Sequence, residues 1–388
     1  MRRDELSTPL HKRSFGQRLW AKRPGLLPLA YGLVLTGFVS GSWWLARQPL
    51  PFAGEPIVVA AVPAVEEVKT AAIDPAPPVE VEQVDSQPLP VKATSRNPEQ
   101  NLDVAMSDSS EIFTNPHQSL VKAPINALVE NSDQGPLPKI GLGGKKPSDA
   151  YARMVSANAV HSDQPKIAII LGGMGLNDKL TARAARDLSG DITFAFAPYG
   201  PNLQDQVNKA REQGHEILLQ LPLEPVGFPA SNPGPKTLLA DADTPTNLQN
   251  LQWHMSRFTG YAGVVNYMGG RFMASPEAVK PMLSELKKRG LIFVEDGSLP
   301  LSSTDDVAQA VHQPVRHADV VIDASPDAQS IAEALGKLEE QARSQGFAMG
   351  TGSGLAITVD TVRDWAKSAR DRGIILVPAT AAFKGRMG

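Results

Sequence analysis

The second half of the chain alternates between short apolar runs and helical patterns, and this alternation limits the fold more than any other feature. The first run, KIAIILG at residues 166–172, is apolar beyond its lysine, as expected of a strand that is buried on both faces. Helical patterns follow such runs, and several end at a glycine, for example Gly214, Gly290 and Gly346. Strand and helix therefore alternate about eight times along this part of the chain.

The alternation predicts an α/β fold built on a parallel sheet, because right-handed crossovers place each helix against the strands that it connects. Repeating units of about 28 residues favour a (β/α) barrel of 7–8 parallel strands, which we place at residues 165–382. An open, doubly wound parallel sheet is the alternative. In a barrel of this kind, functional side chains stand at the carboxyl ends of the strands.

Acidic side chains follow several of the expected strands. Glu224 comes after the third strand, Glu295 and Asp296 come after the fifth, and Asp323 comes after the sixth. Carboxylates gathered at one rim cost electrostatic energy unless they are paired, protonated or bound to a metal. The rim is therefore our candidate site, with a structural ion pair to Arg271 as the alternative role for Glu224.

Three stretches at the expected strand ends, together with the order of the elements, resemble one known family. They are LQLPLEP at residues 219–225, VVNYMGGRF at 264–272 and RGLIFVEDGS at 289–298. The folded part resembles the divergent polysaccharide deacetylases, exported (β/α)-barrel proteins related to metal-dependent de-N-acetylases. The resemblance implies hydrolysis of an acetamide on a glycan. A divalent metal, usually zinc, would polarise the carbonyl, and a carboxylate would take a proton from water.

The residues with which this family holds its metal are largely replaced here. The family has an Asp pair after the first strand and a His after the fourth, and Glu295 aligns with its Asp after the fifth. Because zinc takes about three His or carboxylate ligands, the sequence does not support the standard metal site. We predict no metal ligands, and the cofactor stays undetermined. The replacing residues are Gly172, Gly173, Gln220, Tyr267 and Ser353.

The resemblance leaves two functional hypotheses open. In the first, the protein deacetylates an envelope glycan or acetylated oligosaccharide, and Glu224, Glu295 and Asp296 carry proton transfer. In the second, it is a non-catalytic glycan-binding or scaffolding module of the cell envelope that has lost its metal site. The predicted substrate-binding residues are Tyr199, Asn266, Tyr267, Arg271 and Asp323.

Three segments of different composition precede the predicted barrel. Residues 1–25 are basic, and residues 26–46 carry no charge and are long enough to cross a bilayer as a helix. Residues 47–164 hold about half of the chain's 33 prolines and more acidic than basic side chains, which predicts a disordered linker. A cleaved signal peptide with a site near residues 60–62 is the alternative to a retained anchor.

The charge distribution also predicts location and partners. Positive charge before the apolar run predicts a cytoplasmic amino terminus, a single pass through the inner membrane and a periplasmic barrel. A formal net charge of −3 supplies no general basic field, so we expect no nucleic-acid partner. The chain has no cysteine, which excludes a thiolate nucleophile and cysteine-ligated metal.

Overall fold

The computed structural model describes residues 118–383. The basic tail predicted at residues 1–25, the transmembrane helix predicted at 26–46 and residues 47–117 of the predicted linker lie outside this range. Between residues 118 and 383, no helix is both long enough and apolar enough to cross a bilayer.

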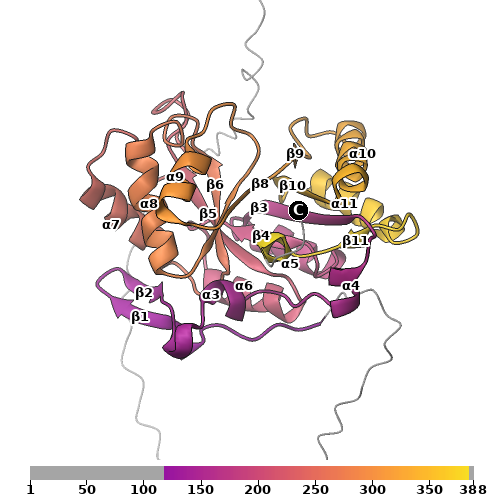
Figure 1. Ribbon diagram of the computed structural model, residues 1–388, viewed down its shortest axis with the longest axis horizontal. Coiled ribbons are helices and arrows are strands. Elements are labelled where there is room, and N and C mark those ends of the chain that lie inside the picture. Colours follow the sequence, from indigo (N-terminus) through magenta and orange to yellow (C-terminus); the bar gives the residue numbers. More distant parts are fainter. Residues whose placement is uncertain (1–117, 384–388) are drawn as a thin grey trace, which may run out of the picture. The chain divides into compact units, whose positions relative to one another are not determined.

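A curled parallel sheet forms the centre of the folded unit (Figure 1). Its main path runs β8-β7-β6-β5-β4-β3-β10-β9, and β11 pairs with the start of β3 beside that path. Every pairing in this sheet is parallel, which confirms the predicted α/β fold with a parallel (β/α) sheet. The strands are β3 (Lys166–Met174), β4 (Thr193–Phe196), β5 (Ile217–Leu223), β6 (Gly263–Met268), β7 (Ile292–Glu295), β8 (Val315–His317), β9 (Val320–Val321), β10 (Phe347–Ser353) and β11 (Ile375–Leu376).

The two ends of the sheet path are joined by the chain itself. β8 pairs with β7 and β9 pairs with β10, yet only Ala318 and Asp319 separate β8 from β9. At this joint the Ala318 amide donates to the Glu295 carbonyl on β7, and the Asp319 amide donates to the Met349 carbonyl on β10. One continuous segment thus bridges β7 and β10, and the carboxyl ends of the strands surround a common rim.

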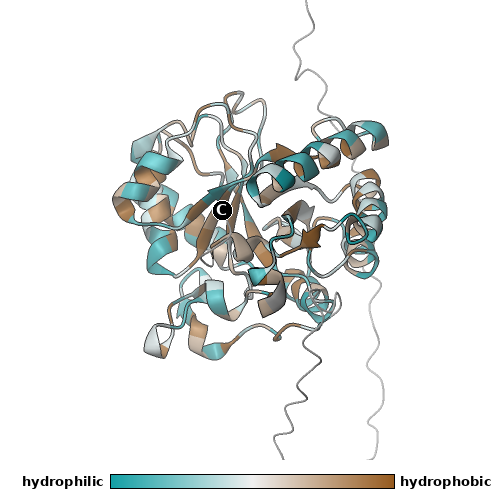
Figure 2. Ribbon diagram, turned by 45° about the vertical axis from the view of Figure 1, so that its right-hand side comes forward, coloured by the Kyte–Doolittle hydropathy of each residue, from teal (hydrophilic) through white to brown (hydrophobic). Residues whose placement is uncertain are grey.

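Helices follow the strands and pack against the outer side of the sheet (Figure 1). Side-chain caps start several of them: Asn177 Oδ1 accepts from the Leu180 amide at 3.1 Å, and Asp243 Oδ1 accepts from the Thr246 amide at 2.7 Å. Figure 2 shows hydrophobic and hydrophilic residues alternating along the helices, as expected of amphipathic helices that cover a sheet. The helices are α5 (Asp178–Asp187), α6 (Leu203–Glu212), α7 (Thr244–Met255), α8 (Pro276–Lys288), α9 (Thr304–Val311), α10 (Ala328–Gln345) and α11 (Ala356–Ala369), and η3 (Ala379–Phe383) ends the described chain.

Alternation along the strands divides the core into two clusters. On β3, Ile167 and Ile169 belong to the cluster between the sheet and the helices, whereas Ala168 and Ile170 belong to the cluster inside the curl. Successive side chains of a strand point to opposite faces, so every second residue faces inward. The same rule determines which residues near the strand ends reach the interior of the rim.

The folded unit begins earlier than the predicted boundary at residue 165. Leu128 and Tyr151 are buried, and Arg153 Nε forms an ion pair with Asp191 Oδ1 at 2.8 Å. Residues 118–164 are therefore part of the fold and not a disordered linker. Sustained periodicity is absent because this segment packs through short elements and single anchoring residues. The elements are η1 (Asn126–Leu128), β1 (Val129–Ser132), β2 (Gly135–Pro138), η2 (Leu142–Gly144), α3 (Pro147–Ala150) and α4 (Ala157–His161).

Candidate functional site

A cavity of about 570 Å³ opens where the parallel strands end. Residues near the carboxyl ends of β3, β5, β6 and β10 line it, together with residues that follow β7 and β9. Gln220 and Thr351 reach it because they continue the inward faces to which Leu218 and Met349 belong. A concave site of this size at the carboxyl ends of parallel strands is suited to a small ligand.

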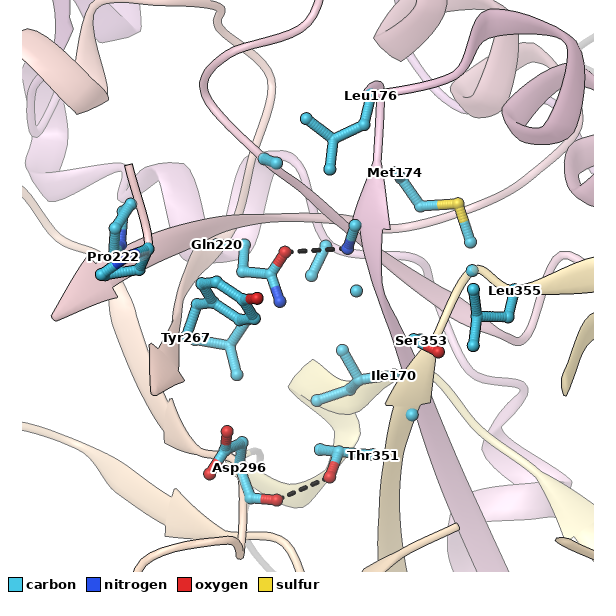
Figure 3. Close-up of a pocket in the computed structure, with 18 of the residues that line it drawn as sticks. Ile170, Met174, Leu176, Gln220, Pro222, Tyr267, Asp296, Thr351, Ser353 and Leu355 are labelled. Carbon is cyan, nitrogen blue, oxygen red and sulfur yellow. Dashed lines mark hydrogen bonds between the residues drawn. The ribbon is translucent and has the colours of Figure 1, made fainter. Parts of the chain in front are cut away.

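Asp296 follows β7 and lies in this cavity (Figure 3). Its Oδ1 accepts hydrogen bonds from the Ser298 amide at 3.0 Å and from the Ser298 hydroxyl at 2.7 Å. Burial raises the pKa of Asp296 above its ordinary value, although hydrogen bonds from Ser298 and Asn266 oppose the rise. Such a carboxyl group can hydrogen-bond a polar ligand or exchange a proton with it.

Two amide side chains in the cavity are held in fixed orientations. Asn266 Oδ1 accepts from the Asp296 amide at 2.8 Å, and Asn266 Nδ2 donates to the Met268 carbonyl at 2.8 Å. Gln220 Oε1 accepts from the Gly173 amide at 2.8 Å, which leaves its Nε2 directed into the cavity (Figure 3). Asn266 therefore positions the loop that carries Asp296, whereas Gln220 presents a hydrogen-bond donor to a ligand.

Asp323 follows β9 and also lines the cavity, but one of its oxygens is engaged within the fold. Asp323 Oδ2 accepts from the Ser353 amide at 2.8 Å, the Ser353 hydroxyl at 2.5 Å and the Thr358 hydroxyl at 2.8 Å. These bonds tie the end of β10 to the first turn of α11. Oδ1 is the oxygen of Asp323 that remains for a ligand.

Tyr199 and Tyr267, both predicted to bind substrate, line the cavity. Tyr267 is 40% exposed, and its ring lies beside Gln220 in Figure 3. The Tyr199 hydroxyl donates to the Pro235 carbonyl at 2.8 Å, and burial raises the Tyr199 pKa, so this ring stays neutral. The Tyr267 ring offers an aromatic face to a ligand, whereas the Tyr199 ring packs near Trp253.

Glu224 and Arg271 lie outside the cavity and bind each other. Glu224 Oε1 is 2.5 Å from Arg271 Nη1, and Glu224 Oε2 accepts from the Ala240 amide at 2.6 Å. The same guanidinium also pairs with Asp241. The structure thus records the ion pair that the sequence offered as the alternative role for Glu224, and it brings neither residue into contact with the cavity.

Glu295 ends β7 but does not line the cavity. Its Oε2 accepts from the Ser302 hydroxyl at 2.6 Å and the Thr304 hydroxyl at 2.5 Å, and its Oε1 is 3.4 Å from His317 Nδ1. His317 Nε2 in turn lies 2.7 Å from Asp305 Oδ1. These contacts join the loop after β7, the start of α9 and β8.

Charge pairing shifts the pKa values of Glu295 and His317. Burial alone would raise the pKa of Glu295, but hydrogen bonds from His317, Ser302 and Thr304 outweigh it and hold that pKa below its ordinary value. The hydrogen bond to Glu295, helped by Asp305, raises the pKa of His317 to about 9 against the effect of burial. Glu295 therefore stabilises the fold as a carboxylate paired with an imidazolium ion.

Several lining residues were not among the predicted site residues. Gln220 is one, and the apolar residues Met174, Leu176 and Leu355 are others. The signal for Gln220 was available, because it is a polar side chain inside the apolar strand β5. No comparable signal exists for the apolar residues, since a methionine at a strand end or a leucine in a loop does not by itself indicate a site.

The side chains of the cavity do not fit the metal that the resemblance implies. Across residues 118–383, no group of three or more His, Cys, Asp or Glu side chains could hold a metal ion. The cavity supplies only two carboxylates, Asp296 and Asp323, and Asp323 Oδ2 already accepts three hydrogen bonds. Zinc sites need about three protein ligands. We therefore assign no chemical step to a metal.

Comparison with known proteins decides the family. A family model described as divergent polysaccharide deacetylase matches residues 169–383, which is more than half of the chain. The chain belongs to this family. The match covers every strand end that contributes to the cavity, and it agrees with the family that the three strand-end stretches resemble.

Relatives of this divergent polysaccharide deacetylase family member include proteins of known structure. The crystal structure of an uncharacterized protein from Agrobacterium tumefaciens C58 is 40% identical, with a TM-score of 0.61, and the match covers 64% of this chain and 99% of that one. An uncharacterized protein of Haemophilus influenzae is 25% identical over 191 residues, 49% of this chain and 66% of that protein. Escherichia coli YibQ, also uncharacterized, is 22% identical over 188 residues, 48% of this chain and 58% of YibQ. The matches thus span less than two thirds of these last two relatives.

Proposed function

We propose that this family member binds a saccharide in its cavity and does not remove acetyl groups by the metal-dependent route. One contrast within the cavity carries this proposal. Polar side chains still converge there, from Gln220, Asp296 and Asp323, while Gly172 and Gly173 stand where, by the resemblance, the family carries its Asp pair. The cavity therefore keeps groups that recognise a polar ligand and lacks the donors that would hold the metal.

The chemistry of the lining suits a sugar. A pyranose presents hydroxyl groups that both donate and accept hydrogen bonds, together with faces of C–H bonds. Gln220 Nε2 can donate and the Asp296 carboxylate can accept, and both lie on the same side of the cavity as the half-exposed ring of Tyr267 (Figure 3). Membership of a deacetylase family supports a glycan as the natural ligand.

Proton transfer by Asp296 without a metal is a second candidate function. The place of Asp296 in the cavity favours this role, and so does burial, because burial raises the pKa of this carboxyl group and a higher pKa favours the proton-donating form that a general acid needs. Glu224 and Glu295 do not assist in this arrangement, since both are bound to other residues outside the cavity.

The predicted location makes an envelope glycan our proposed ligand. A retained anchor at residues 26–46 would hold the barrel in the periplasm, where such glycans are found. Detection of the intact amino terminus in isolated inner membranes tests the anchor, and a chain shortened to about residue 60 would contradict it.

The test of saccharide binding uses residues 97–388, a fragment that contains the whole described part of the chain, residues 118–383. This fragment is expected to fold alone, because a solved Agrobacterium relative matches over 99% of its own length while covering only 64% of this chain. Titration with oligomers of N-acetylglucosamine is followed by calorimetry, and bound metal and released acetate are measured on the same samples. Gln220→Ala and Asp296→Asn should each weaken binding about tenfold, the effect of losing one hydrogen bond to a charged or buried group.

The matched control is Glu333→Gln, which changes an exposed acidic residue of α10 and should leave affinity unchanged. Saturable binding without acetate release supports the proposal. Acetate release that needs Asp296 but no metal supports the second candidate. Stoichiometric metal together with metal-dependent acetate release, or no binding of any oligosaccharide, would overturn the proposal.

A further inference from the structure

Exposed leucines gather at the mouth of the cavity. Leu176, between β3 and α5, is 56% exposed, Leu355, between β10 and α11, is 48% exposed, and Leu180 on α5 is 37% exposed. All three line the cavity, and Ile357, 38% exposed, lies two residues beyond Leu355. Single exposed leucines are ordinary on protein surfaces, but several around one opening indicate a surface that contacts a ligand.

The apolar lining continues from the mouth into the cavity. β3 and β10 are neighbouring parallel strands, so the loops that follow them lie side by side. Met174 at the end of β3 packs close to Gly354, where an added Cβ would lie 3.1 Å from the Met174 Cε. We call Met174, Leu176, Leu180 and Leu355 the apolar side of the cavity. In Figure 3, Leu176, Met174 and Leu355 lie together, apart from Gln220, Tyr267 and Asp296.

The charged side chains that line the cavity limit the charge that the polar part of a ligand can carry. None of the residues that line it is Lys, Arg or His, and its ionisable acidic groups are Asp296 and Asp323. A phosphate, sulfate or uronic acid carboxylate would face these groups without a positive partner, which is costly in a partly buried site. The polar part of the ligand should therefore carry no negative charge.

We propose that the natural ligand is an uncharged saccharide that carries a hydrocarbon chain. The sugar binds between Gln220 and Asp296, and the chain lies along the apolar side and leaves past Leu176 and Leu355. This inference rests on the proposed function, because the polar half of the site is the saccharide site argued above. It adds a ligand class, an amphiphilic glycoside, that saccharide binding alone does not require.

The experiment compares glycosides that differ only in chain length. Methyl, butyl, hexyl and octyl glycosides of N-acetylglucosamine are titrated into residues 97–388, each below its micelle-forming concentration. Each methylene that is fully buried should tighten binding by about three- to fourfold. We therefore expect affinity to rise along the series and to level off where the chain extends beyond the mouth.

Variants assign the effect to the two halves of the cavity. Leu176→Ser and Leu355→Ser should flatten the dependence of affinity on chain length, because both side chains lie where the hydrocarbon chain leaves the cavity. Gln220→Ala should weaken all four glycosides by the same factor. Leu142→Ser is the matched control, since Leu142 is 97% exposed and does not line the cavity, and it should change nothing.

The possible failures are distinguishable. Equal affinity for the methyl and octyl glycosides would show that the ligand carries no hydrocarbon chain, and would leave the saccharide-binding proposal in place. 1-Octanol could also bind as tightly as the octyl glycoside, with no effect of Gln220→Ala. That result would overturn both the amphiphilic ligand and the proposed saccharide binding. Attachment of the fragment to neutral phosphatidylcholine vesicles that is lost in Leu176→Ser identifies a membrane as the occupant and overturns the proposal. Failure of every glycoside to bind at millimolar concentration overturns both proposals.

Discussion

Gly172 and Gln220 both replace residues of the family pattern, and the two replacements depend on each other because the residues are in contact. A Cβ added at Gly172 would lie 2.5 Å from Gln220 Nε2, so an aspartate there requires the glutamine to move. The neighbouring Gly173 has a φ of 72°, which side-chain-bearing residues rarely adopt, and its amide holds Gln220 Oε1. The glycines therefore do more than remove metal ligands, because they allow the glutamine to take its orientation in the cavity.

Glu224→Gln tests whether this carboxylate is structural. Glu224 is 2% exposed and is bonded to Arg271 and the Ala240 amide, so we expect the free energy of unfolding to fall by about 1–3 kcal/mol. Affinity for oligosaccharides should not change. Denaturant unfolding and calorimetric titration measure the two effects.

Asp241→Asn is the control for Glu224→Gln. Asp241 pairs with the same guanidinium, but its side chain is 80% exposed, so the substitution should have no measurable effect. Lost binding with unaltered stability would show that Glu224 acts on the ligand.

At the scale of the elements, strand alternation separates two adjacent carboxylates. Asp296 lines the cavity, whereas Glu295, one residue earlier, is bonded to Ser302 and Thr304 at the start of α9. Neighbouring residues along a strand point to opposite faces, so only one of the two can reach the rim interior. The outer carboxylate is then available to pair with His317 on the adjacent strand, β8.

The pairing of β7 with β8 should make stability depend on pH. The pKa of His317 is raised from 6.5 to about 9, so the folded protein holds this proton more tightly than the unfolded chain. The stabilisation is complete below pH 6.5 and is lost as the pH rises to about 9. We expect a loss of about 1 kcal/mol, because the exposed part of the imidazole is screened by solvent.

His317→Gln should abolish most of this pH dependence between pH 6.5 and 9, as followed by urea unfolding at a series of pH values. His161→Gln is the control, because His161 is exposed at the end of α4, and its profile should match that of the unaltered protein. An unchanged profile in His317→Gln would show that other groups carry the dependence.

At the scale of the whole folded unit, residues 118–164 belong to the same structure as the barrel. Arg211 connects the two through three carbonyl groups, with Nε donating to Val121 at 2.9 Å and Nη1 donating to Tyr151 at 3.0 Å and to Gly260 at 3.1 Å. A buried guanidinium is costly unless its donors are satisfied, and two of these acceptors come from the amino-terminal segment. The barrel therefore depends on a segment whose composition resembles that of a linker.

Truncation tests this dependence. A fragment of residues 165–388 loses Arg153, which leaves Asp191 without its buried ion-pair partner, and it uncovers the surface that Leu128 and Tyr151 cover. Breaking a buried ion pair alone costs about 3–5 kcal/mol, a large part of the stability of a typical domain. We expect residues 165–388 to lack a cooperative thermal transition by circular dichroism, while residues 97–388 melt cooperatively. Equal melting temperatures would contradict the claim.

The fold was largely predictable, and the candidate site was predictable only in part. Apolar runs separated by helical patterns are local signals, and they identified the parallel α/β sheet. Asn266, Tyr267, Asp296, Asp323 and Tyr199 were all predicted, and all line the cavity. Glu224, Glu295 and Arg271 were assigned to the same rim but lie outside the cavity. Glu224 pairs with Arg271, which the sequence offered only as the alternative, and Glu295 faces away from the rim interior toward Ser302 and His317, because strand alternation becomes certain only once the strand is placed.

By itself, the sequence determined the strand-and-helix order, the family and the loss of metal-binding residue types, since each depends on residue identity along a short stretch. Tertiary structure decided which carboxylates face the cavity, where the folded unit begins and how leucines from separate loops form one apolar side. These outcomes depend on which groups, distant in sequence, come together to form ion pairs, hydrogen bonds and apolar contacts. That information exists only once the strands have curled round a common rim.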